Sequence, residues 1–249
     1  MLGVHDDDTT TRDGFTFTYL GRRGDDLALS DYRGTWDLQR SVHARVAAGE
    51  IGPRVLFVQH PPVYTAGRRT LPQERPFDGT EVVDVDRGGK ITYHGPGQLV
   101  GYPVVTLTRR IGPLEYVRRL EQAVIELLDA HGVRGGTVEG RTGVWLPASH
   151  GRPERKICAI GVRVARMTTM HGFALNLTST STGPFRNIVP CGISDAGVTS
   201  LEDELGHPAP SLVEVAQALE PLLARYLDFA LAPDAEASVP AGRIVGTTA

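Results

Sequence analysis

The chain has 249 residues, of which 41% are hydrophobic and 22% are charged, with a formal net charge of −3 at pH 7. This length is near the upper limit for one hydrophobic core, and the charge gives no argument for nucleic acid or an anionic membrane as partner. No apolar run approaches a membrane span, and the acidic start is unlike a signal peptide. Two cysteines, Cys158 and Cys191, exclude a disulfide framework and favour a reducing cytoplasm.

The composition along the chain predicts one folded domain with polar ends. We expect residues 1–13 to form a disordered N-terminal segment and residues 233–249 a flexible C-terminal tail. Residues 14–232 show no internal repeat and no low-complexity linker. A single domain over that range is therefore predicted.

Three segments have the apolar periodicity of amphipathic helices, at residues 30–48, 113–131 and 211–229. Pro113 suits the first turn of the second helix and Gly132 suits its end. The expected apolar positions of the first helix are Trp36, Val42 and Val46, with Gly49 ending it. Those of the second are Leu114, Val117, Leu120, Val124, Leu127 and Leu128.

The third helix has the clearest start signal. Ser211 and Glu214 have the spacing of a capping box, and Pro221 is expected to kink the helix. Its predicted apolar stripe consists of Leu212, Val215, Ala216, Leu219, Leu222, Leu223 and Tyr226.

Six further segments read as strands, and the last two are separated only by Ala165 and Arg166, which predicts a hairpin. Because strands come in runs rather than alternating with helices, we expect an α+β fold with a mixed, largely antiparallel sheet and flanking helices. The strand segments are 55–59, 82–86, 99–106, 143–146, 156–164 and 167–177.

The run from Arg87 to Gly97, RGGKITYHGPG, is the most unusual stretch of the chain. Four glycines lie between two strand-like segments, and glycine allows another group to approach the backbone closely. This pattern favours the wall of a binding site that carries His94. The alternative is an elaborate turn without a ligand.

The sequence lacks the common motifs of several enzyme classes. There is no Walker A loop, no dinucleotide fingerprint, no GxSxG elbow, no CxxC and no HExxH. Cys158, Cys191, His94 and His171 are of metal-binding type but have no metal-ligand spacing, so no metal is expected.

A thiol and an amine remain as candidates for chemistry. Cys191 lies in the short segment IVPCGI, whose proline and glycine favour a fixed loop, although a free cysteine is often only a small buried hydrophobe. Cys158, in the middle of a strand, fits that second description better. Lys156 is expected to share a strand face with Cys158, Ile160, Val162 and Val164. A partly desolvated lysine is a usable base, and an ammonium beside a thiol favours the thiolate.

The two histidines near these segments differ in their surroundings. His171 lies on a candidate strand, where a hydrogen-bonded structural role is the commoner one. His94 lies between Tyr93 and Gly95, where a ligand can come close. The residues alone leave open whether Lys156 lies beside Cys191.

Six ordered motifs together resemble the lipoyl(octanoyl) transferase family, from about residue 27 to about residue 228. This family moves an octanoyl group from acyl carrier protein to a lysine of lipoyl domains. The motifs are HPPVYTAGR at 60–68, RGGKITYHGPGQLVGYP at 87–103, GVW at 143–145, KICAIGVR at 156–163, HGFALN at 171–176 and IVPCGI at 188–193, followed by TSL at 199–201.

The resemblance implies the fold of biotin and lipoate protein ligases and a ping-pong acyl transfer in the cytoplasm. It implies that Cys191 carries the acyl thioester and that Lys156 acts as general acid and base. The substrate-binding residues that it implies are Arg87, Gly88, Gly89, Lys90, Ile91, Thr92, Tyr93, His94, Ala159, Ile160, Gly161, Gly172, Phe173 and Ala174.

The resemblance also implies the partners. The donor is octanoyl-acyl carrier protein, which carries the acyl group on its phosphopantetheine, so no separate cofactor is expected. The acceptors are lipoyl domains of 2-oxoacid dehydrogenase E2 subunits and the glycine cleavage H protein. One departure from the family pattern is Cys158, where alanine is common.

Three other functions stay open. An ATP-dependent lipoate or octanoate ligase of the same fold would not need Cys191. A cysteine hydrolase would release free octanoate, and a carrier-binding module would have no turnover.

Overall fold

The computed structural model describes residues 7–149, 151–188 and 196–231. Within these residues the main sheet has the strand order β1-β2-β5-β9-β13-β12-β11-β10, with β14 beside β12. The β2–β5 and β12–β14 pairs are parallel, and the other pairs are antiparallel. The strands are β1 (Asp8–Arg12), β2 (Phe15–Tyr19), β5 (Arg54–Val58), β9 (Gln98–Val104), β10 (Gly136–Val138), β11 (Arg141–Leu146), β12 (Arg155–Ala165), β13 (Thr168–Asn176) and β14 (Gly197–Val198).

Smaller elements flank this sheet. A three-stranded sheet has the order β7-β6-β8, and β3 pairs with β4. These strands are β3 (Arg22–Arg23), β4 (Asp26–Leu27), β6 (Val63–Ala66), β7 (Val82–Asp84) and β8 (Thr92–His94). The α-helices are α1 (Tyr32–Ala47), α2 (Pro113–Ala130), α3 (Leu201–Leu205) and α4 (Leu212–Tyr226). Short 3₁₀ helices occupy Pro72–Glu74, Ser179–Ser181, Gly183–Asn187 and Asp228–Ala230. The predicted α+β class with a mixed, largely antiparallel sheet is therefore confirmed.

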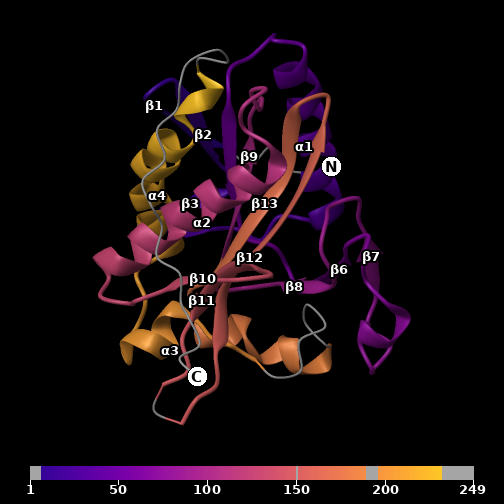
Figure 1. Cartoon of the computed structure of the whole chain (residues 1–249), viewed down its shortest axis with the longest axis vertical. Helices are drawn as coiled ribbons and strands as arrows, with labels where there is room; N and C mark the ends of the chain where they lie inside the picture. Colours follow the sequence, from indigo (N-terminus) through magenta and orange to yellow (C-terminus); the bar gives the residue numbers. More distant parts are fainter. Residues whose placement is uncertain (1–6, 150, 189–195, 232–249) are drawn as a thin grey trace.

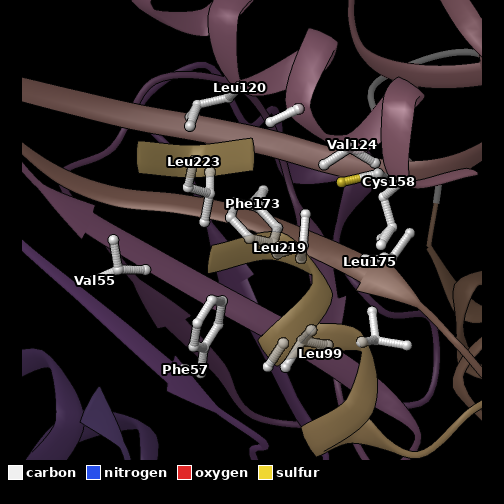
Figure 2. Close-up of a cluster of buried hydrophobic side chains, with 14 of the residues drawn as sticks. Val55, Phe57, Leu99, Leu120, Val124, Cys158, Phe173, Leu175, Leu219 and Leu223 are labelled. Carbon is white, nitrogen blue, oxygen red and sulfur yellow. The ribbon is translucent and has the colours of Figure 1, made fainter. Parts of the chain in front are cut away.

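Helices α2 and α4 cover one face of the main sheet, and they pack against each other (Figure 1). The core under them includes Phe57 from β5, Phe173 from β13, and Leu219 and Leu223 from α4 (Figure 2). The opposite face of the central strands has its own apolar cluster, which includes Val100 and Ala174. Helix α1 packs on β9 and β13, and the sheet β7-β6-β8 lies to one side of the long β12–β13 hairpin (Figure 1).

The predicted β12–β13 hairpin is present, with its turn one residue later than expected. Ala165 pairs with Thr168, so the two-residue loop is Arg166 and Met167. Both loop residues have positive φ, 50° and 58°, as in the primed turns that match the twist of a hairpin.

The N-terminal prediction was wrong in part. Residues 8–12 of the supposed disordered segment form β1, which pairs along its whole length with β2. Thr10 and Arg12 both donate hydrogen bonds to the carboxylate of Glu220 on α4, which attaches the strand to the domain. Residues 1–6 and the predicted tail at 233–249 lie outside the described residues.

The helices begin and end within two or three residues of the predicted positions. Ser211 caps α4, and its side chain and that of Glu214 form the expected capping box.

The buried face of α1 differs from the predicted one with Trp36 and Val42. The buried residues of this helix are Tyr32, Thr35, Gln39, His43 and Val46. Leu114 is also 70% exposed instead of buried. The polar stripe of α1 contacts backbone: Gln39 and His43 both hydrogen-bond to main-chain atoms of β12 or β13.

Strand β12 contains one extra residue relative to its neighbour β11. Val144 pairs with Cys158, whereas Trp145 pairs with Lys156, so Ile157 has no partner across the pair. A bulge of this kind shifts the alternation of side chains by one residue. Lys156 therefore does not share a face with Cys158, contrary to the sequence-based prediction.

Candidate active site

A cavity of about 330 Å³ lies along β9, β12 and β13, mostly on the face that carries the cluster with Val100 and Ala174, and it also reaches Val117 of α2. The segment from Arg87 to Thr92 together with His94 forms one wall, and residues of β9, β12 and β13 form the floor. Lys156 lines the same cavity. Of the expected substrate-binding residues, those at the cavity are Arg87, Gly88, Gly89, Lys90, Ile91, Thr92, His94, Ala159, Ile160, Gly161, Gly172, Phe173 and Ala174.

Tyr93 is the one member of that set that does not line the cavity. It lies between Thr92 and His94 on β8, where alternation turns its side chain to the other face. Its ring packs against Tyr64 and Phe185, with centroids 5.3 and 5.9 Å away. Tyr93 therefore belongs to the apolar cluster behind the wall.

The floor of the cavity is made of small residues that face each other across β12 and β13. Ala159 pairs with Ala174, and Gly161 pairs with Gly172. Because these four side chains are small or absent, the pleated surface leaves room above it. A Cβ on Gly161 would lie 3.0 Å from Cδ of Arg87, so the wall already approaches the floor closely at this point.

The side chain of Arg87 holds the wall of the cavity in place through hydrogen bonds. Its buried guanidinium donates to the carbonyl oxygens of Gly88 and Lys90 at 3.0 and 2.8 Å. It also donates to the carbonyl and the hydroxyl of Thr65 on β6, both at 2.9 Å. A fixed fork of donors suits such multiple contacts, so Arg87 shapes the glycine-rich loop from inside.

Asp86 attaches the same wall to the sheet. Its carboxylate accepts hydrogen bonds from Nε2 of His171 at 2.9 Å and from the guanidinium of Arg163, and the Gly88 N–H donates to the Val162 carbonyl at 2.9 Å. The His171 hydrogen bond is the main cause that lowers the pKa of Asp86. Burial lowers the pKa of His171, so the pair is best described as neutral imidazole donating to carboxylate.

His171 also has unusual backbone geometry. Its φ is +59°, a left-handed conformation that non-glycine residues rarely adopt and that often marks functional sites. Its backbone N–H donates to Oε1 of Gln39 on α1 at 3.1 Å, outside the sheet ladder. This conformation places His171 at the cavity beside Trp36, with ring centroids 6.0 Å apart.

A hydrogen-bond chain fixes the ring of His94. Gln98 Nε2 donates to Oδ1 of Asn176 at 2.8 Å, and Asn176 Nδ2 donates to the Thr199 carbonyl at 3.0 Å. The Gln98 oxygen is therefore left to accept from Nδ1 of His94 at 2.8 Å. Burial lowers the pKa of His94 to about 3, so the ring is neutral with its proton on Nδ1.

A second neutral histidine stands behind the first. Nδ1 of His60 donates to the Ser30 carbonyl at 2.7 Å, and its Nε2 accepts from the Tyr102 hydroxyl at 2.9 Å. Burial lowers the pKa of His60 to about 4. Tyr32 stacks on His94 with centroids 5.9 Å apart, so one corner of the cavity is aromatic and polar.

The two cysteines have different positions. Cys158 is fully buried in the core under α2, and burial raises the pKa of its thiol well above the ordinary value (Figure 2). It does not line the cavity. Cys191 lies outside the described residues. The described flanks of its segment are close to the site, because Ile188 packs with Ile91 and Val198 pairs with Lys156.

Sequence reasoning missed several cavity residues. Tyr32 and Val117 come from helical segments in which nothing indicates a site, and Val100 and Tyr102 lie in the motif at 87–103 but were not singled out. Asp86, which attaches the wall to the sheet, was missed as well. The motif at 60–68 does contain His60, but its contact with Tyr102 depends on strand pairing that the sequence does not specify. Among the described residues no group of three or more His, Cys, Asp or Glu could hold a metal ion. No described helix has the length and apolarity needed to cross a bilayer.

Comparison with known proteins identifies the family of this chain. Residues 31–224 match the family described as the lipoyl protein ligase A/B catalytic domain, and the chain belongs to that family. An octanoyltransferase of Cutibacterium acnes is 54% identical over 87% of this chain and 81% of its own length. One of Salinispora tropica is 51% identical over 90% of this chain and 100% of its own length.

Solved structures show the same fold at low sequence identity. A lipoate-protein ligase A bound with ATP has a TM-score of 0.56 and 17% identity, and the alignment covers 77% of this chain and 81% of that one. A bipartite lipoate protein ligase from Thermoplasma acidophilum, described with its E2 lipoyl domain, has a TM-score of 0.54 and 17% identity. That alignment covers 77% of this chain and 80% of that one.

Proposed function

We propose that this protein transfers an octanoyl group from octanoyl-acyl carrier protein to a specific lysine of lipoyl domains, such as those of 2-oxoacid dehydrogenase E2 subunits and the glycine cleavage H protein. Curated relatives named octanoyltransferases, more than 50% identical over most of the chain, support this reaction. The observation that carries the proposal is the cavity, in which Lys156 lies at the edge of a floor of small residues.

The cavity is suited to a short acyl chain. Its floor of Ala159, Gly161, Gly172 and Ala174 allows apolar carbons to lie along β12 and β13. Each buried methylene contributes about 0.8 kcal/mol, so an octanoyl chain supplies roughly 5 kcal/mol before the cost of ordering it. Gly88 and Gly89 close over it as the opposite wall.

The chemistry is two successive acyl transfers. The thiolate of Cys191 attacks the donor thioester, the bond from the acyl carbon to the phosphopantetheine sulfur breaks, and that sulfur leaves as a thiol after taking a proton. A deprotonated lysine of the lipoyl domain then attacks the Cys191 thioester, which forms an amide and returns the thiol. Lys156 carries protons in both halves as general base and acid. The free energy of the thioester drives the reaction, so it needs no nucleotide, metal or separate cofactor.

The positions of the two lysines support this assignment. The chain contains only Lys90 and Lys156, and both line the cavity. Lys90 is paired with the carboxylate of Glu74 behind the wall. Lys156 is half-buried on the strand that pairs with β14, the described strand next after the Cys191 segment. Lys156 is therefore the better placed amine for proton transfer.

The test is intact-mass analysis after incubation with octanoyl-acyl carrier protein. We expect one octanoyl adduct on the wild-type chain, which disappears when a lipoyl domain is added and appears there as an amide. Cys158→Ala should keep the adduct and Cys191→Ala should lose it. An adduct confined to Cys158 would refute the assignment. ATP-dependent octanoylation of the lipoyl domain by Cys191→Ala would instead support a ligase, and release of free octanoate a hydrolase.

A further inference from the structure

Trp145 lies directly beneath the side chain of Lys156. The two residues pair across β11 and β12, and Nζ of Lys156 lies 4.5 Å from the centroid of the indole ring. This distance is within the range of a cation–π contact, in which an ammonium is attracted to the negative face of an aromatic ring. The ring is 2% exposed, so water competes weakly for that face.

The indole itself is fixed in place. Its Nε1–H donates to the Arg141 carbonyl at 3.2 Å, within the same strand. The bulge at Ile157 sets Lys156 opposite Trp145 instead of one residue away. Both features therefore determine the position of the Lys156 side chain. The bulge places it on the same face of the sheet as Trp145, and the indole ring contacts its amine there.

We propose that Trp145 is a positioning residue, which holds the Lys156 ammonium at the cavity through the face of the indole ring. The role of Lys156 in proton transfer rests on the proposed function, but the contact with Trp145 does not. This proposal gives a physical reason for the tryptophan of the GVW motif at 143–145, because its ring contacts the lysine.

Other charged groups around Lys156 come from neighbouring elements. Glu121 on α2 is buried, and burial raises the pKa of its carboxyl, while hydrogen bonds from Gly143 and Arg118 and the charge of Lys156 lower it. On β12 itself the nearby titratable group is the thiol of Cys158. On β11 the guanidinium of Arg141 lies 5.7 Å from the indole centroid. Variants at position 145 leave all three groups in place.

The experiment measures the reactivity of Lys156 without any substrate. A trace of acetic anhydride labels amines only in their deprotonated form, and digestion followed by mass spectrometry quantifies Lys156 and Lys90 separately. Lys90 is the internal reference, because it is the chain's other lysine and has no contact with Trp145 among the described residues. Trp145→Leu and Trp145→Phe form a matched pair, since both lose the indole N–H and only leucine loses the aromatic face.

At pH 7 we expect Lys156 in Trp145→Leu to be labelled about two- to tenfold faster than in the wild type, relative to Lys90. Trp145→Phe should stay within about twofold of the wild type. At about pH 11, where ordinary lysine amines are deprotonated, the ratio should return to near one. An equal ratio at both pH values would mean altered access rather than a cation–π contact and would overturn the proposal, as would unchanged labelling in the leucine variant.

Fluorination of the ring tests the same contact if Trp145→Leu fails to fold. In a Trp36→Phe background, position 145 carries the only indole of the chain. Biosynthetic replacement by 5-fluorotryptophan weakens the negative face with almost no change of shape, and we expect faster labelling of Lys156 at pH 7 than in the unfluorinated Trp36→Phe protein. An identical rate would contradict the proposal. These outcomes do not depend on whether Cys191 becomes acylated, so failure here and failure of the proposed transferase activity are distinguishable.

Discussion

The guanidinium of Arg87 donates to both the carbonyl and the hydroxyl of Thr65, each at 2.9 Å, and so joins the glycine-rich wall to β6. The resemblance assigned Arg87 to substrate binding, whereas its described contacts bind the loop that the substrate would meet. The wall keeps its shape because one buried side chain donates to carbonyl groups of the loop and of β6 at the same time.

Arg87→Lys should therefore destabilise the protein. A lysine retains the charge but cannot reach the two sides of the loop at once, so we expect the free energy of unfolding to fall by about 2–4 kcal/mol. Thr65→Val, which removes only the hydroxyl acceptor, should cost about 1 kcal/mol. Urea denaturation of the three proteins measures both values. Equal stability of Arg87→Lys and the wild type would show that the hydrogen bonds of Arg87 contribute little.

Methyl groups added to the floor should act differently at its two glycines. A Cβ at Gly161 meets Cδ of Arg87 at 3.0 Å, which can shift slightly, so Gly161→Ala should fold and prefer donors with shorter acyl chains. A Cβ at Gly172 would lie 2.1 Å from the backbone oxygen of Gly101, so Gly172→Ala should lose several kcal/mol of stability.

Gly183→Ala is the matched control for both substitutions, because among the described residues no atom other than those of its chain neighbours lies within 4 Å of the added Cβ. Thermal unfolding and transfer rates with hexanoyl, octanoyl and decanoyl donors distinguish the cases. An unchanged chain-length preference in Gly161→Ala would mean that the acyl chain does not lie over β12.

The two buried histidines His60 and His94 should make the stability of the protein depend on pH. Burial lowers the pKa of His60 to about 4 and that of His94 to about 3, from 6.5. Below pH 6.5 the histidines of the unfolded chain bind protons, whereas those of the native state stay neutral. Their contribution to the free energy of unfolding is therefore complete above pH 6.5 and is lost as the pH falls toward 4. Each histidine contributes a slope of about 1.4 kcal/mol per pH unit in this window.

Denaturation at pH 8, 6 and 5 checks this dependence. His60→Gln should be less stable than the wild type at pH 8 but should lose less stability between pH 6 and 5. The two histidines should contribute almost no slope between pH 7.5 and 9. A wild-type profile that is flat from pH 6 to 5 would contradict the burial of neutral rings.

Cys158 should be inert in the native state. Its side chain is fully buried and burial raises the pKa of its thiol, so thiolate forms there with difficulty. In a Cys191→Ala background, iodoacetamide should alkylate the native protein at least about a hundredfold more slowly than the unfolded protein, since reaction requires opening of the core. Rapid native-state alkylation at Cys158 would show that the core under α2 opens easily.

Much of the fold followed from local patterns. Helices α2 and α4 were predictable because their apolar stripes and terminal signals agree, and the β12–β13 hairpin because only two residues separate its strands. Helix α1 was predicted in position but not in face, since its buried side is polar and contacts backbone. Strand β1 was missed because its stability comes from pairing with β2 and from the distant Glu220.

The site was predictable only as a set of segments. Glycine and histidine at 87–94 marked a wall, but the partners that shape it, Thr65 and Asp86, are fixed by tertiary contacts. The face of Lys156 was predicted wrongly, because a period of two assumes an unbroken strand. Nothing in KIC at 156–158 indicates that Ile157 is an extra residue.

The extra residue Ile157 also separates the Cys158 thiol from the cavity. In a regular strand, Lys156 and Cys158 would share a face, and under the proposed mechanism the lysine would then have a second thiol within reach. The bulge instead places the Lys156 side chain at the cavity and the Cys158 thiol in the core, so Cys158 lies out of reach of a substrate bound in the cavity.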